Sequence, residues 1–211
     1  MPRFDAILFD FDGVLLDSEP LHCACWAEVL APLGVKLDWD YYREHYLGVD
    51  DRVMIPRIAS SAVPPVDWRT LWAQYPNKRD CLRKRLEKPP FPPELAGLLA
   101  DLRRDHKLAV VSTSARVEVE PPLEAGGIRH YFDAVVTGEN TERHKPAPDP
   151  YLVAAGLIGA RKPLVVEDSA PGIASGRAAG FEVLAVESAS GMPALLRGVL
   201  AGGWSDSQSA E

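Results

Sequence analysis

The sequence predicts an α/β fold in which a parallel β-sheet core carries an inserted helical segment. From about residue 107 onward, short apolar runs alternate with helical segments, which is the pattern of βαβ units. The first apolar run is separated from the second by about 100 residues, far more than one crossover helix needs. The intervening chain is therefore expected to form a second, smaller domain.

Five short apolar runs are the expected strands, because continuous apolar runs of this length are typical of strands buried on both faces. They are Ala6–Phe9, Leu108–Val111, Ala134–Val136, Leu164–Val166 and Val183–Val186. The segments between the last four strands are the expected crossover helices, Val117–Ala125, Pro150–Leu157 and Ile173–Ala179. Asp149 is placed to cap the second of these, and Gly180 is placed to end the third. One more short helix is expected at Met192–Leu200.

The inserted segment has helical patterns, such as Leu21–Leu33 and Trp68–Leu86, and little that indicates strand. Proline-containing crossings bracket it, which suits a cap that can rock over the sheet. We therefore predict a core of residues 1–18 and 89–201, a cap of residues 19–88, and a disordered tail of residues 202–211.

Composition and charge exclude several classes of protein. With 46% hydrophobic and 25% charged residues, the 211-residue chain has an amino-acid composition typical of globular proteins. Its net charge of −7 opposes attraction to nucleic acid or to an anionic membrane surface. The sequence contains no apolar stretch long enough to span a membrane and no apolar region typical of a signal peptide. We expect a cytoplasmic monomer with no nucleic-acid or membrane partner.

The chain has three cysteines, Cys23, Cys25 and Cys81, without the paired CxxC spacing of a zinc site. An odd number of cysteines also gives no indication of a disulfide framework. We interpret them as reduced, mostly buried thiols.

Polar residues follow the expected strands at the edge where ligands bind to parallel sheets. Asp10 and Asp12 follow the first strand, Ser112 follows the second, and Glu167 and Asp168 follow the fourth. Carboxylates so close repel one another unless a cation neutralises them, and an oxygen-only set suits Mg²⁺ rather than zinc. With a lysine from the loop after the third strand, this set is suited to holding a phosphate group.

Four segments carry a resemblance to a known family. Asp10-Phe11-Asp12-Gly13-Val14-Leu15-Leu16-Asp17-Ser18-Glu19-Pro20 resembles motif I of the haloacid dehalogenase (HAD) superfamily, and specifically of its β-phosphoglucomutase-like phosphohydrolases. Ser112 resembles motif II, Lys145 in Lys145-Pro146-Ala147-Pro148-Asp149 resembles motif III, and Glu167-Asp168-Ser169-Ala170-Pro171-Gly172-Ile173 resembles motif IV. Any one motif is weak evidence, but all four occur in order, between about Phe4 and Val186.

The resemblance implies a Rossmann-like core and an Mg²⁺-dependent phosphatase that acts on a small phosphorylated metabolite, such as a sugar phosphate. Asp10 would be the nucleophile that forms an aspartyl-phosphate, and Asp12 the acid/base. Mg²⁺ would be held by the Asp10 carboxylate, the Asp12 carbonyl and Asp168, with Glu167 nearby or acting through water. The residues that would hold the phosphoryl oxygens are Ser112, Thr113 and Lys145. Those expected to contact substrate from the cap are His22, Trp26, Arg52 and Lys78.

Other interpretations stay open. Taken singly, an Asp-x-Asp pair is usually a solvated turn, Lys145 an ordinary surface lysine, and the cap residues packed or solvated side chains. A sugar phosphomutase of the β-phosphoglucomutase type is one alternative, but the arginine expected soon after Gly48-Val49 comes late, behind two acids, at Arg52. A non-catalytic protein that binds a phosphorylated metabolite is the alternative from another class.

Overall fold

The computed structural model describes residues 3–47, 49 and 51–203, and the chain divides into two compact units. We call Met1–Asp17 with Lys88–Glu211 the core, and Ser18–Glu87 the cap. The predicted tail is outside the described residues from residue 204 onward, as are Gly48 and Asp50 in the cap.

The core contains a parallel sheet of five strands in the order β3-β2-β1-β4-β5. The strands are β1 (Ala6–Phe9), β2 (Lys107–Val111), β3 (Ala134–Val136), β4 (Pro163–Glu167) and β5 (Glu182–Ala185). Every neighbouring pair is parallel. The predicted α/β class and all five strands are confirmed, although the bounds of β2, β4 and β5 each differ from the predicted ones by one residue at one or both ends.

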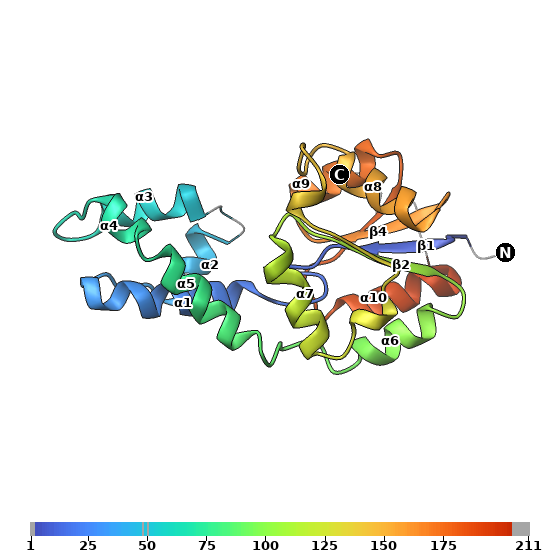
Figure 1. Cartoon of the computed structure of the whole chain (residues 1–211), viewed down its shortest axis with the longest axis horizontal. Coiled ribbons are helices and arrows are strands. Elements are labelled where there is room, and N and C mark those ends of the chain that lie inside the picture. The colour runs from blue at the N-terminus through green and yellow to red at the C-terminus, as the bar shows by residue number, and fades with distance from the viewer. Residues whose placement is uncertain (1–2, 48, 50, 204–211) are drawn as a thin grey trace. The chain divides into compact units, whose positions relative to one another are not determined.

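Helices cover both faces of the sheet (Figure 1), with α8 (Asp149–Ile158) and α9 (Ala170–Ala178) on one face. The helices α6 (Leu95–Leu102), α7 (Arg116–Ala125) and α10 (Met192–Gly198) lie on the other. Short helical turns complete the core at Arg129–Tyr131, Gly138–Asn140 and Val199–Gly203. Because both faces are covered, β1 is buried along its whole length, and this explains why it appears in the sequence as an unbroken apolar run.

The strand order determines where two of the acids predicted for the site, Asp10 and Glu167, meet. β1 lies between β2 and β4, and Phe9 pairs with Val166 across the β1–β4 ladder. The next residues, Asp10 and Glu167, therefore reach the carboxyl end of the sheet side by side. The strand order reverses at β1, and the crevice at such a reversal is where open α/β sheets bind ligands.

In the cap, all the regular elements described between Ser18 and Glu87 are helices or helical turns. They are α1 (Glu19–Leu30), the short turn Ala31–Leu33, α2 (Trp39–His45), α3 (Asp51–Ser61), α4 (Trp68–Trp72) and α5 (Tyr75–Arg85). The cap has its own apolar cluster, in which Trp26, Met54 and Leu71 are completely buried. Among the described helices of the chain, none has the length and apolar character to cross a membrane.

Two local predictions are wrong. The expected single helix Trp68–Leu86 is two helices, because Pro76 lacks the N–H that a continuous helix would need there and instead starts α5. Asp149 is the first residue of α8 rather than its cap, a position that Pro148 occupies. Gly180 has the positive φ of 79° expected of a glycine just after a helix.

Candidate active site

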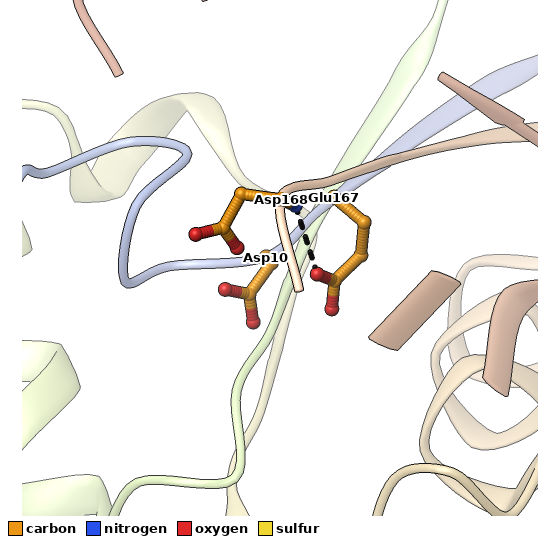
Figure 2. A group of neighbouring side chains, drawn as sticks. All are labelled: Asp10, Glu167 and Asp168. Carbon is orange, nitrogen blue, oxygen red and sulfur yellow. Dashed lines mark hydrogen bonds between the residues drawn. The ribbon is translucent and has the colours of Figure 1, made fainter. Parts of the chain in front are cut away.

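Three acidic residues meet at the carboxyl ends of β1 and β4. Asp10 follows β1, Glu167 is the last residue of β4, and Asp168 comes next. One carboxylate oxygen from each lies within 4.8 Å of the others. Asp10 and Glu167 are buried, whereas Asp168 is exposed. Figure 2 shows the Glu167 and Asp168 side chains leaving the chain in opposite directions, as consecutive residues of extended chain do.

Both oxygens of Glu167 are occupied by hydrogen bonds. Oε1 accepts from the Lys145 ammonium at 2.6 Å and from the Tyr151 hydroxyl at 2.9 Å. Oε2 accepts from the backbone N–H groups of Asp168 and Ser169 and from the Ser169 hydroxyl, each at 3.0 Å. This buried carboxylate is therefore fully satisfied by the protein itself.

Lys145 is the cation of the site. Its Nζ donates to Asp10 Oδ1 at 2.5 Å, to Glu167 Oε1 at 2.6 Å and to the Val111 carbonyl at 2.9 Å. Burial by itself lowers the pKa of Lys145, but the charges of Asp10 and Glu167 outweigh burial and raise it above its ordinary value. Lys145 therefore stays charged and holds the Asp10 carboxylate in place.

The acids resist ionisation when no further cation is present. Burial raises the pKa of Asp10 well above its ordinary value, Lys145 opposes this rise, and Glu167 and Asp12 add to it. Loss of hydration raises the pKa of Asp168 to about 7, and the charge of Glu167 contributes. One lysine is therefore too little positive charge for this cluster.

The chemistry of these donors fits Mg²⁺, which prefers oxygen ligands from one or two carboxylates. Asp10 and Asp168 each offer a carboxylate oxygen to this cluster, and no nitrogen or sulfur ligand belongs to the cluster found among the described residues. Glu167 has both oxygens occupied, so it fits better as a residue that supports this site than as a direct ligand.

Asp12 belongs to a second hydrogen-bonded group. The Ser114 hydroxyl donates to Asp12 Oδ2 at 3.1 Å, and the Ser114 backbone N–H donates to Ser112 Oγ at 3.0 Å. Ser112 is buried, Asp12 is half-buried and Thr113 is exposed. The loop after β2 is thereby joined to the loop after β1.

Two glycines let the chain approach these acids closely. At Gly13, where φ is +76°, a Cβ atom would lie 2.0 Å from Asp168 Oδ2. At Gly172, in the first turn of α9, a Cβ atom would lie 1.7 Å from Glu167 Oε1. A side chain at either position would displace an acid of the site.

The structure adds residues that the sequence analysis did not assign. Ser114 lies in the Ser112-Thr113-Ser114 run, so a hydroxyl close to the assigned Ser112 was an available signal. For Tyr151 the sequence provided no indication of a role in the site, because an aromatic residue on an apolar helix face is usually part of the core.

The cap brings together three of the four residues expected to contact substrate. Lys78 is buried, and its Nζ lies 2.9 Å from His22 Nδ1 and 2.9 Å from Asp51 Oδ2. The Trp26 indole N–H donates to Asp51 Oδ1 at 2.8 Å. Arg52 follows on α3 and is exposed. We call Lys78, His22, Asp51 and Trp26 the cap cluster.

Comparison with known proteins identifies relatives over most of the chain. Residues 7–186 match the family described as haloacid dehalogenase-like hydrolase. The fructose-1-phosphate phosphatase YqaB of Escherichia coli is 31% identical over 190 residues, which cover 87% of this chain and 97% of that protein. The plasmid phosphoglycolate phosphatase of Cupriavidus necator is 30% identical over 185 residues, which cover 86% and 80%.

One solved structure is similar to this chain in both sequence and fold. The crystal structure of CbbY from Rhodobacter sphaeroides in complex with phosphate is 28% identical to this chain and matches it with a TM-score of 0.66. The match covers 85% of this chain and 84% of that one.

Proposed function

This chain belongs to the haloacid dehalogenase-like hydrolase family and is a phosphohydrolase, and from that premise we propose that it is an Mg²⁺-dependent phosphatase of sugar phosphates. The single observation that carries the proposal is Asp10, a buried carboxylate held by Lys145 at the carboxyl end of β1. A carboxylate positioned in this way can attack phosphorus and form an aspartyl-phosphate.

Lys145 and Ser112 are proposed to bind the phosphoryl oxygens. The Lys145 ammonium contacts Asp10 directly, so a phosphoryl group that reaches Asp10 also reaches a positive charge. That charge is most useful in the transition state, where negative charge spreads over the phosphoryl oxygens. Thr113 would contribute through its backbone, since its side chain is exposed.

Asp12 is proposed to protonate the leaving oxygen and then to take a proton from water. It lies two residues after Asp10, and the Ser114 hydroxyl donates to its Oδ2 and so helps to orient the carboxyl group. General acid/base catalysis of this kind contributes about 10²–10⁴-fold to the rate.

Asp10 and Asp168 would hold Mg²⁺ by their carboxylates, together with the backbone carbonyl of Asp12. Bound there, the ion would supply the positive charge that the phosphoryl group and the clustered acids require. Glu167 would keep Lys145 in position. In the cap, the half-buried His22 and the exposed Arg52 are proposed to contact the sugar. Trp26 and Lys78 are buried, and we propose that they hold Asp51 and His22 in position.

The test is phosphate release by the full chain from fructose 1-phosphate, other sugar phosphates, phosphoglycolate and nucleotides, with and without Mg²⁺. We expect release from at least one sugar phosphate, dependent on Mg²⁺ and abolished by Asp10→Asn. Asp12→Asn should lower kcat by about 10²–10⁴-fold. Asp101→Asn, which alters an exposed acid on α6, is the matched control and should keep full activity.

Other outcomes would overturn the proposal. Release from phosphoglycolate or nucleotides alone would reject the sugar phosphates as its substrates, and release that persists in Asp10→Asn would reject the nucleophile. Isomerisation of a sugar phosphate that requires a bisphosphate primer, without net phosphate release, would identify a mutase. Saturable stabilisation by phosphorylated ligands with no product would identify a binding protein.

A further inference from the structure

The cap contains a pair of thiols that the proposed reaction does not use. Cys25 lies on α1 and Cys81 lies on α5, and their Sγ atoms are 2.6 Å apart although the residues are 56 positions apart in the sequence. The helices α1 and α5 pack against each other, so this proximity comes from the packing of the cap and not from a flexible loop.

The two thiols differ in their surroundings. Cys25 is completely buried, whereas Cys81 is half-buried and lines a surface hollow of about 500 Å³. The Arg85 guanidinium donates from Nε to Cys81 Sγ at 3.4 Å, and it also pairs with Glu28 at 2.9 Å. Glu28 Oε2 also accepts from the Cys81 thiol at 3.6 Å. Cys81 therefore combines partial solvent access with an adjacent ion pair, in which the Arg85 guanidinium favours the thiolate that reacts with oxidants.

We propose that Cys25 and Cys81 are a redox modification site, which a small hydroperoxide converts to a reversible disulfide between α1 and α5. In the first step the Cys81 sulfur attacks a peroxide oxygen. An S–O bond forms, the O–O bond breaks, and water leaves when the oxidant is hydrogen peroxide. In the second step the Cys25 sulfur attacks Cys81, and a second water leaves with the Cys25 proton. Two thiols are oxidised and one peroxide is reduced to two waters.

The order of the two steps follows from the structure. Burial raises the pKa of Cys25 to about 12, and the hydrogen bond with Cys81 adds to this rise. A thiol that holds its proton so tightly is a poor first nucleophile, because the thiolate is the reactive form. Cys81 reacts first and Cys25, already in contact, completes the disulfide.

The disulfide would form one helical turn from the cap cluster. Lys78 precedes Cys81 by three residues on α5, and His22 precedes Cys25 by three residues on α1. Residues three apart on a helix lie on the same side. The crosslink would therefore fix the spacing of the two helices beside the contact between Lys78 and His22.

The experiment exposes the full chain to hydrogen peroxide, blocks the remaining free thiols with an alkylating reagent, and maps the peptides by mass spectrometry. We expect a peptide that links Cys25 to Cys81, with Cys23 alkylated, and full reversal by dithiothreitol. Proteolysis within the cap should slow in the oxidised protein and return to its original rate after reduction.

Cys81→Ser should abolish the crosslink and the change in proteolysis. Cys23→Ser, which alters a buried cysteine on the same helix, is the matched control and should leave both unchanged. Three alkylated cysteines after oxidation, a disulfide that includes Cys23, or Cys81 oxidised to sulfinic acid with Cys25 still alkylated would each overturn the proposal. Mapping of the unmutated chain decides the question even if a variant does not fold.

Discussion

Glu167 occupies space that exists only because residue 172 has no side chain. Its carboxylate accepts hydrogen bonds from Lys145, Tyr151 and Ser169 and from two backbone N–H groups. A Cβ atom at Gly172 would overlap the carboxylate, at 1.7 Å from Oε1 and 2.3 Å from Oε2, so the carboxylate would have to move away from these partners. The position of Lys145, and through it that of Asp10, thus depends on one glycine of α9.

We expect Gly172→Ala to lower both activity and stability. Displacement of Glu167 should shift Lys145 and reduce kcat about 10²-fold, as small misplacements of catalytic groups do. Overpacking should lower the free energy of unfolding by about 1–3 kcal/mol. The measurements are phosphate release and urea unfolding. Gly156→Ala on α8, where a Cβ atom meets nothing within 4 Å, is the control and should be neutral or slightly stabilising. Equal behaviour of the two variants would contradict the argument.

At the scale of elements, buried polar contacts join the cap helices. Lys78 of α5 contacts His22 of α1 and Asp51 of α3, so one ammonium connects three helices. The Lys78 side chain is only 3% exposed and that of Asp51 20%. Removing one partner of a buried ion pair lowers the free energy of unfolding strongly, because the other charge is left buried and unpaired. Replacing both partners lowers it less.

We expect Lys78→Met to lower the free energy of unfolding by about 3 kcal/mol, because Asp51 loses its cation. Asp51→Asn should also destabilise the chain, and the double variant should lose less than the sum of the two. A double-mutant cycle from urea unfolding measures this coupling. Additive effects would show that the two residues do not act as a pair.

A second contact between elements makes the cap sensitive to alkaline pH. Burial and the charge of Glu19 raise the pKa of Tyr42, whose hydroxyl donates to Glu19 at 2.6 Å. Above pH 10 the unfolded chain loses this proton while the folded chain keeps it. The folded state then binds more protons, so stability falls as the pH rises, at up to about 1.4 kcal/mol per pH unit.

We expect Tyr42→Phe to remove part of this alkaline loss of stability. The measurement is the urea midpoint of the unmutated chain and of Tyr42→Phe between pH 9 and pH 11. The midpoint of the unmutated chain should fall more steeply with pH than that of the variant. Parallel curves would show that Tyr42 ionises alike in the folded and unfolded chain.

At the scale of the whole molecule, metal binding should stabilise the fold because the acids of the core are crowded. We expect 1 mM Mg²⁺ at pH 8 to raise the thermal midpoint by several degrees, since a ligand that binds only the folded state stabilises it. EDTA should reverse the shift. Asp168→Asn should abolish it, whereas Asp101→Asn on the surface of α6 should retain it. A shift retained in Asp168→Asn would place the metal elsewhere.

The sequence by itself determined the α/β class, the five strands and the family, because each depends on short-range signals. An apolar run is buried in the fold wherever it occurs in the chain. Each of the four motifs lies within a short stretch of sequence. The candidate residues Asp10, Glu167 and Lys145 could be predicted for the same reason, since parallel strands bring their carboxyl ends to one edge.

Only the tertiary structure decided the partners of these residues. Lys145 is 135 positions from Asp10, and no local pattern specifies that it would also contact Glu167 or that Tyr151 would join them. Lys78 is in a strongly basic segment that indicates a solvated face, yet the fold of the cap buries it. A hydrogen bond or ion pair between distant residues depends on which helices pack together, and the packing of the whole chain determines this.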